Sequence, residues 1–119
     1  MSDKIATAAE LIASVRKVAS ENFDFNYQRE YGTDARCQYV DPDTLEGRCL
    51  IGKGAIEAGI DPKVFLDFNR SGVRRHITDI LEEADSNSTD WLAFAQNRQD
   101  QGVDWGVAVQ MADKEFLKL

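Results

Sequence analysis

Cys37, Cys49 and His76 are the side chains of this chain best suited to bind a transition metal or to supply a nucleophile and its base. A closed zinc site needs four such ligands. Neither a Cys-x-x-Cys nor a His-x-x-x-His spacing occurs in the sequence, although an acidic residue could complete the set. The sequence therefore predicts no metal site, and we interpret Cys37 and Cys49 as two reduced, largely buried thiols.

Cys49 is also the candidate for a cysteine nucleophile. It stands where a helix is expected to begin, a position at which the helix dipole lowers the pKa of a thiol. His76 is the only candidate base, and it directly follows Arg74 and Arg75. We interpret Cys49 as a packing residue and His76 as a surface residue. A small cysteine-based enzyme or redox switch remains the least favoured alternative.

Acidic groups and glycines suggest three further kinds of site. The acids within Glu82–Asp85 and Asp41–Asp43 are explained by helix caps and turns rather than by hydrolytic pairs. Asp41–Asp43 also lacks the twelve-residue spacing of a calcium loop. The glycines of Gly47–Gly54 do not match a phosphate-binding P-loop, which ends in Gly-Lys-Ser/Thr. The sequence thus predicts no catalytic, cofactor-binding or metal-binding residue, no cofactor, and a protein that is not an enzyme.

A helix corner near Gly59 could belong to a DNA-binding helix-turn-helix. Ala55 and Gly59 have the small-residue spacing of such a bend, and a helix capped by Asp61 is expected to follow over residues 62–69. That helix is mostly apolar or acidic, whereas a major-groove reader is polar and basic. We therefore interpret the corner as a packing device and keep a DNA-binding regulator as an alternative. Its phosphate contacts would be the basic cluster just beyond the corner: Arg70, Arg74 and Arg75.

The charge balance limits the classes of partner. The 119 residues include 21 acids against 14 lysines and arginines, a formal net charge of −7. Affinity for a nucleic-acid backbone depends on Lys and Arg, so this composition disfavours nucleic acids and anionic membranes. No apolar run approaches the roughly 20 residues needed to span a bilayer, and the stretch MSDKIATAAE is not a signal peptide. We expect a cytoplasmic protein that contacts no membrane.

About five short helices are expected to position these residues. The first runs from a cap at Ser2 or Asp3 to about Ser20 and presents an apolar stripe at helical spacing. A second begins at about Cys49 and ends at Gly59, where glycine can adopt the left-handed conformation of a helix cap.

The C-terminal half shows three more helical patterns. A short helix over 62–69 and an amphipathic helix over 73–84 are followed by a linker and cap within 85–89. The last two helices should form a hairpin at Gly102, with Asp104 as the cap of the second. Their expected buried side is formed by Trp91, Phe94, Ala95, Arg98, Trp105, Ala108, Val109, Ala112 and Phe116.

A β-hairpin is expected between the first two helices. Aromatic and polar residues alternate over 23–27, which is the period of a half-buried strand. A turn at 32–34 leads to a return strand over 36–40, with 45–48 as a candidate third strand. The predicted fold class is therefore α+β: a small antiparallel β-hairpin packed against about five short helices, in a single domain spanning residues 1–119.

Gly52 and Gly54 both fall inside the helix that begins near Cys49. Each glycine costs roughly 1 kcal/mol of helix stability relative to alanine, so we expect another backbone, the hairpin or the first helix, to lie close to them. If these glycines instead face solvent, alanine there should stabilise the helix, and a loss of partner binding in a stabilised Gly54→Ala variant would place the smooth helix surface at an interface. Gly52 and Gly54, together with Arg70, Arg74 and Arg75, are the candidate interaction residues.

Two short motifs resemble a family of small proteins of unknown function from actinobacterial phages, prophages and their hosts. The first motif is Cys37, Tyr39, Val40, Cys49, Leu50, Ile51 and Gly52; the second is Ala95, Gln96, Gln99, Asp100, Gly102, Trp105 and Gly106. The resemblance implies a small intracellular protein of phage or accessory-genome origin, and it carries over no catalytic residues.

These observations favour a non-enzymatic protein-interaction module, a phage- or prophage-derived modulator of a host cytoplasmic protein. The partner would be a host or phage protein. Its identity, the formation of a homodimer, and mimicry of DNA by the acidic surface are left open by the sequence.

Overall fold

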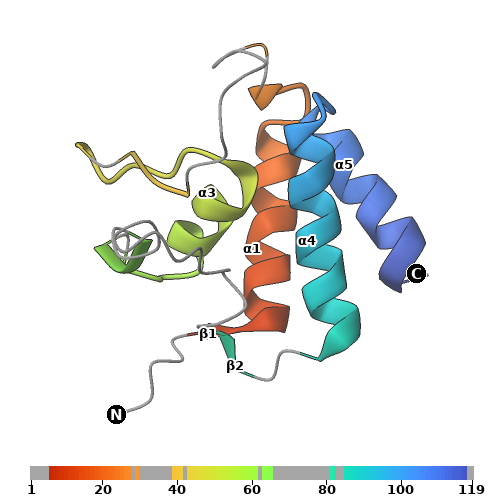
Figure 1. Ribbon diagram of the computed structural model, residues 1–119, viewed down its shortest axis with the longest axis horizontal. Helices are drawn as coiled ribbons and strands as arrows, with labels where there is room; N and C mark the ends of the chain where they lie inside the picture. Colours follow the sequence, from red (N-terminus) through yellow and green to blue (C-terminus); the bar gives the residue numbers. More distant parts are fainter. Residues whose placement is uncertain are drawn as a thin grey trace.

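A computed structural model of the chain describes residues 6–27, 29, 39–41, 43–61, 63–65, 81–82 and 85–117. In this part of the chain the α-helices are α1 (Ala8–Glu21), α3 (Leu50–Glu57), α4 (Ser86–Asp100) and α5 (Trp105–Ala112), and α5 continues into the π-helical segment η3 (Asp113–Leu117). The two-residue strands β1 (Ala6–Thr7) and β2 (Leu81–Glu82) pair in parallel, with Ala6 opposite Leu81 and Thr7 opposite Glu82. Helix α1 lies between α3 on one side and the pair α4 and α5 on the other (Figure 1).

Helix α1 begins later than the sequence pattern predicted. Its N-cap is Thr7, whose hydroxyl accepts a hydrogen bond from the Glu10 backbone N–H at 3.1 Å. The Glu10 carboxylate in turn accepts from the Thr7 backbone N–H, which completes a capping box. The expected cap at Ser2 or Asp3 is therefore wrong, because Thr7 has extended backbone geometry and pairs with β2. The buried stripe of α1 is Ala8, Leu11, Ile12, Val15, Val18 and Ala19.

The expected antiparallel hairpin is also wrong, and with it the α+β fold class: the described part of the chain is mostly helical. The aromatic stretch after α1 is irregular and lies against the start of α5. The Phe25 carbonyl accepts from the Trp105 N–H at 2.9 Å, and the Phe23 carbonyl accepts from the Gly106 N–H at 3.0 Å. The stretch therefore satisfies the unpaired N–H groups of a helix N-terminus instead of pairing with a strand.

The Asp41 turn forms a small loop that projects from the body beside α3 (Figure 1). A single antiparallel bridge joins Val40 to Gly47, and the Asp41 N–H donates to the Glu46 carbonyl at 2.9 Å. The third strand expected over 45–48 is thus reduced to one bridge. Residues 36–38 of the expected return strand lie outside the described residues.

Helix α3 forms where the sequence predicted a helix, and its last helical residue, Glu57, comes one residue before the expected end. Cys49 is the N-cap, and its sulfur accepts from the Gly52 N–H at 3.4 Å. Gly59 has φ +93°, in the left-handed region. The Ile60 N–H donates to the Ala55 carbonyl at 3.0 Å, which completes a Schellman C-cap.

The helix corner after Gly59 is described only as far as residue 65. The Asp61 carboxylate accepts from the Lys63 N–H at 3.0 Å, as expected of a cap, and residues 63–65 form a 3₁₀ turn. Phe65 is buried and its ring lies 5.0 Å from that of Tyr39. At the end of the helix expected over 73–84, Leu81 belongs instead to strand β2. The remainder of that helix, and residues 66–69 of the candidate recognition helix, lie outside the described residues.

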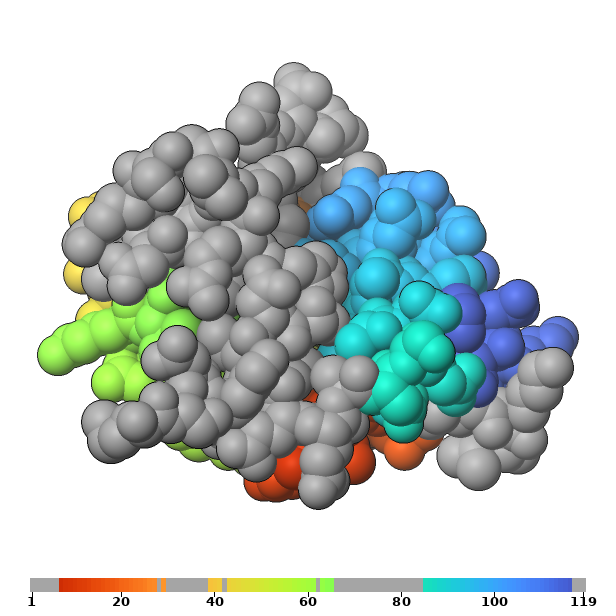
Figure 2. Space-filling view, turned by 60° about the horizontal axis from the view of Figure 1, so that its bottom comes forward, coloured from red at the N-terminus to blue at the C-terminus, as the bar shows by residue number. Residues whose placement is uncertain are grey.

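Helices α4 and α5 form the expected helical hairpin. Their side chains lie next to each other on the surface of the molecule (Figure 2). The Asp85 carboxylate caps α4 by accepting from the Ser88 N–H at 2.7 Å. Gly102 makes the turn with φ +91°. Asp104 stands at the N-cap position of α5 but makes no side-chain cap; it accepts instead from Asn26 Nδ2 at 2.9 Å. Its expected capping role is wrong because the Phe23–Asn26 stretch occupies this helix end.

The core lies where α1, α3, α4 and α5 meet. Its largest fully buried side chains are Trp91, Trp105, Tyr27, Leu11, Leu50, Ile51, Ile60, Leu92, Gln99 and Val15. The Cα radius of gyration is 13.3 Å, close to the value of about 13.5 Å expected for a compact chain of this length. Within the described residues, none of the helices has the length and apolar character needed to cross a bilayer.

Candidate functional site

An open groove of about 520 Å³ lies between α1, α3 and the projecting loop. The last turn of α1 and the last turn of α3 form two of its walls, and the loop forms the third. The described residues that line it are Val18, Glu21, Asn22, Leu45, Glu46, Gly47, Lys53, Ile56 and Glu57. Concave sites of this volume are large enough for a small ligand or for a few residues of a peptide.

The walls of the groove combine apolar side chains with a charged rim. Val18 is buried, while Leu45 and Ile56 are partly buried and face the groove as lining residues. The carboxylates of Glu21, Glu46 and Glu57 are exposed at its rim. A partner would therefore meet apolar surface in the groove and negative charge around it.

Leu45 holds an uncommon backbone conformation at the edge of the groove. Its φ is 63°, in the left-handed region, which costs a non-glycine residue roughly 1–2 kcal/mol. The Leu45 N–H donates to the Asp41 carbonyl at 2.8 Å. The Asp41 carboxylate accepts from the Asp43 N–H at 2.8 Å and the Thr44 N–H at 3.2 Å, and these bonds lower the pKa of Asp41 below its ordinary value. The turn at Asp41 thus holds Leu45 in place.

Two lysines lie at the groove. Lys53 Nζ is 5.6 Å from the centroid of the Trp105 ring and 5.8 Å from that of Phe25, close enough for cation–π attraction to both. Lys17, on α1, forms an ion pair with Glu57, and the hydrogen bond to Glu57 raises the pKa of Lys17. Glu57 is therefore partly neutralised by α1, whereas Glu21 and Glu46 make no ion pair with a described residue.

The described lining of the groove offers three carboxylates, one ammonium group and apolar side chains. Its described lining has no hydroxyl, thiol or imidazole group that could act as a nucleophile or as a histidine base. Within the described residues no group of three or more His, Cys, Asp and Glu side chains is placed to hold a metal ion. The arrangement can hold a partner through apolar contact and charge.

Gly52 and Gly54 are both buried residues of α3. A Cβ added at Gly52 would fall 1.8 Å from the Tyr39 carbonyl oxygen, and one added at Gly54 would fall 3.0 Å from Val15 Cα. The predicted close approach of another backbone is therefore confirmed, at the return segment for Gly52 and at α1 for Gly54. This placement gives both glycines a packing role inside the fold.

The other predicted candidates are described only in part. Cys49 is fully buried at the start of α3. Cys37, His76 and the arginine cluster of Arg70, Arg74 and Arg75 lie outside the described residues.

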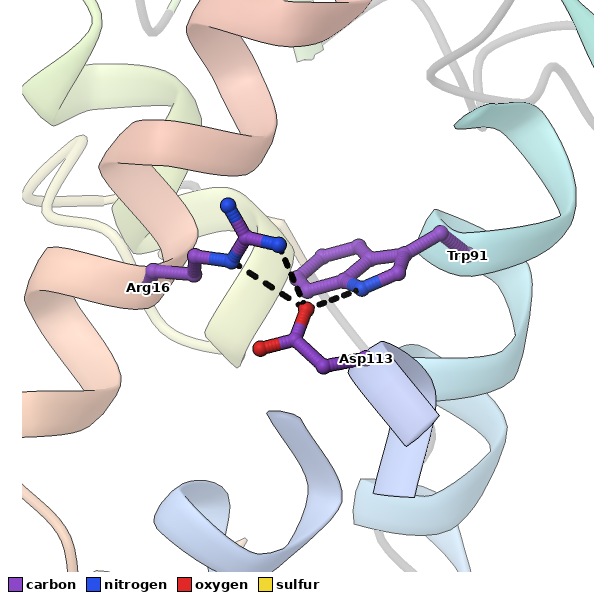
Figure 3. Close-up of polar contacts among 3 residues, drawn as sticks. All are labelled: Arg16, Trp91 and Asp113. Atoms are coloured by element: carbon purple, nitrogen blue, oxygen red, sulfur yellow. Dashed lines mark hydrogen bonds and ion pairs between the residues drawn. The ribbon is translucent and has the colours of Figure 1, made fainter. Parts of the chain in front are cut away.

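Asp113 is the centre of a second polar cluster, which ties three helical segments together (Figure 3). Its Oδ1 atom accepts from Arg16 Nε at 3.1 Å, from Arg16 Nη2 at 2.7 Å and from Trp91 Nε1 at 2.8 Å. Trp91 is fully buried. All three hydrogen bonds go to one carboxylate oxygen. We therefore assign this cluster a structural role, which is to hold α1, α4 and η3 together.

Sequence reasoning missed the two residues that matter most around the groove and the core. Leu45 was expected to begin a strand, and no local signal marks a leucine for the left-handed conformation. Gln99 was noted only as part of a motif, yet it is completely buried. Its Oε1 accepts from the Leu50 N–H at 2.7 Å and from Trp105 Nε1 at 3.2 Å, so it joins the start of α3 to α4 and α5.

Comparisons with protein-family models, with curated proteins and with solved structures find no match to this chain. The resemblance to a family of phage and prophage proteins therefore stays a prediction.

Proposed function

We propose that this chain is a non-enzymatic protein-interaction module that holds an extended segment of a partner protein in the groove between α1, α3 and the projecting loop. This loop contains Leu45, and we call it the Leu45 loop. One observation carries the proposal: the groove is open, has a volume of about 520 Å³, and has Leu45 held in a costly conformation at its edge. Backbone strain of this kind tends to be retained at functional sites.

The lining of the groove supports a protein partner. Protein interfaces combine an apolar centre with a polar, solvent-accessible rim. The apolar residues Val18, Leu45 and Ile56 and the exposed glutamates around them match that arrangement. An extended peptide suits a groove that is open to solvent better than a small molecule, which is usually enclosed on most of its surface.

The finer form of the proposal is a phage- or prophage-derived modulator of a host cytoplasmic protein. Its support is the pair of sequence motifs around Cys49 and Gln99 together with the acidic composition of the chain.

Selection of random peptides tests the general proposal. A surface-displayed library of random peptides is panned against the whole chain, and selected peptides are titrated into ¹⁵N-labelled protein. We expect the amide shift changes to centre on Leu45, Lys53 and Ile56. Shift changes confined to other elements, or the absence of any selected binder, would overturn the proposal.

Matched variants localise the binding. Leu45→Gly removes one apolar wall and is expected to weaken binding by about fivefold or more, from the loss of one partly buried leucine contact. Met111→Ala removes an apolar side chain from α5 that is 37 % exposed, and it should leave affinity unchanged. The reverse pattern would place the interface on α5. Concentration-dependent shifts at the groove without peptide would identify a second copy of the chain as the occupant, which also contradicts the proposal.

A further inference from the structure

We infer that the segment bound in this groove is cationic: an extended stretch of a partner protein in which arginine or lysine stands beside an aliphatic residue. The inference rests on the proposed function and specifies the partner's chemistry. It depends on how the charges around the groove are arranged.

The rim of the groove has an excess of negative charge. Three of the described lining residues, Glu21, Glu46 and Glu57, are exposed carboxylates, and Lys53 is the one basic residue among them. Lys17 pairs with Glu57 from outside the lining, and its charge also interacts with that of Glu21. Glu21 and Glu46 remain as carboxylates that face solvent at the groove.

The helix ends add to this negative potential. A helix C-terminus has a partial negative charge, and Lys or Arg in the last turn normally offsets it. Neither α1 nor α3 has a basic residue in its last turn; α1 ends at Glu21 and α3 ends at Glu57. Both last turns line the groove, so each glutamate adds negative charge to a helix end that is already partly negative. A cation bound in the groove would offset the negative charge at both helix ends.

Lys53 offsets this potential only in part. It is partly buried, and its ammonium group lies near the rings of Phe25 and Trp105, deeper in the fold than the rim glutamates. The carboxylates of Glu21 and Glu46, by contrast, are exposed and open to an arginine or lysine of a partner.

The apolar lining distinguishes a protein segment from a small polycation. Val18, Leu45 and Ile56 offer contact area to an aliphatic side chain, and a polyamine has no such side chain. Because successive residues of an extended peptide point to opposite sides, alternation of aliphatic and basic residues would direct one kind inward and the other to the rim.

Three designed peptides and one polyamine make up the test. The probes are Gly-Ser-Leu-Arg-Leu-Arg-Ser-Gly, the same peptide with both arginines changed to glutamate, the same peptide with both leucines changed to glycine, and spermine. Binding to the full chain is measured by fluorescence anisotropy, with spermine as a competitor, at low salt so that surface charges are little screened. We expect the leucine–arginine peptide to bind about tenfold tighter than either altered peptide, and spermine to compete poorly.

Two double variants, each lacking two negative charges, show whether affinity for the leucine–arginine peptide depends on the charges at the rim or on the net charge of the chain. Glu21→Gln with Glu46→Gln removes two rim charges and should weaken the leucine–arginine peptide about tenfold, since each exposed ion pair contributes about a factor of three. Asp90→Asn with Glu115→Gln removes two exposed charges from α4 and η3, outside the groove lining, and should change affinity less than about twofold. Glu46→Gln alone replaces the double variant if the latter does not fold.

Each contrary result is decisive. Equal binding of the glutamate peptide, equal loss in both double variants, or effective competition by spermine would overturn the cationic-segment inference. Selected random peptides that bind the groove without basic residues would overturn the inference while leaving the proposed function intact. Failure of the designed peptides alone would overturn the inference, whereas failure of the selection would overturn the proposed function itself.

Discussion

Gly54 lies where α3 comes close to Val15 of α1. A Cβ added there would lie 2.4 Å from Val15 Cγ2 and 3.0 Å from Val15 Cα. We expect Gly54→Ala to lower the free energy of unfolding by about 1–3 kcal/mol, because this overpacking outweighs the gain in helix propensity. Urea denaturation followed by circular dichroism measures the change.

Val15→Ala supplies the control for this prediction. It removes Cγ2 and leaves the backbone contact, so Gly54→Ala should be less destabilising in that background than in the wild-type chain. An increase in stability on Gly54→Ala, by up to about 1 kcal/mol, would show instead that α1 and α3 are loosely packed at this point.

The left-handed backbone of Leu45 leads to a second prediction. Leu45→Ala and Leu45→Gly both remove the side chain, but only glycine adopts φ near 63° without strain. We expect the glycine variant to be more stable than the alanine variant by about 1 kcal/mol, the reverse of their usual order. Thermal unfolding of both variants tests this order. An alanine variant that is equally or more stable would mean that the loop relaxes once leucine is removed.

Among the helices, Gln99 is the residue through which three of them are joined. It is buried on α4 and accepts hydrogen bonds from the first N–H of α3 and from the Trp105 indole of α5. Gln99→Met keeps a similar volume but leaves two buried donors without an acceptor, at about 1–3 kcal/mol each. We therefore expect a loss of about 2–6 kcal/mol in the free energy of unfolding, measured by urea denaturation.

Gln110→Met is the matched control, because Gln110 is exposed on α5. Its effect should stay within about 0.5 kcal/mol. If Gln99→Met costs no more than this control, the two donors must find another acceptor, and the polar link between α3, α4 and α5 would be dispensable.

At the scale of the whole molecule, three groups among the described residues make stability depend on pH, because their pKa values are shifted by folding. Backbone hydrogen bonds lower the pKa of Asp41 and of Asp85 below 3.8, so their contributions are present above pH 3.8 and are lost as the pH falls through the folded-state values. The bond to Glu57 raises the pKa of Lys17 above 10.5, so its contribution is present below pH 10.5 and is lost as the pH rises further. We expect the combined contribution of these three groups to form a plateau from about pH 4 to about pH 10.

Melting temperature measured across this range tests the prediction. Asp85→Ala should lower the melting temperature most on the plateau, and its difference from wild type should shrink below about pH 4, where the wild-type cap is protonated as well. Asp90→Asn, a change at an exposed acid that does not cap α4, serves as the control. A difference between Asp85→Ala and wild type that is constant with pH would contradict the assigned role of the Asp85 carboxylate.

The helix boundaries that could be predicted are those with local signals. Gly59 and Gly102 end α3 and α4 in left-handed conformations, and Asp85 caps α4 through the next turn of its own chain. Thr7 and Glu10 also form a local signature, Thr-Ala-Ala-Glu, that marks the true start of α1. Such signals depend on residues within one helical turn, so the sequence by itself determines them. The buried stripes of α1 and α5 belong to the same class.

Only the tertiary structure determined the conformation of the irregular segments. The alternating pattern at 23–27 fits a strand as well as it fits the irregular stretch that forms. In the structure, the Phe23 and Phe25 carbonyls accept hydrogen bonds from the start of α5, far along the chain. The burial of Gln99 likewise depends on partners that its neighbours in sequence do not specify. The groove exists because α1, α3 and the Leu45 loop are brought together. A hydrogen-bonding group or an apolar side chain can pair with many distant partners, and only the packing of the folded chain determines which one it contacts. For this reason the sequence pattern alone could not locate the site.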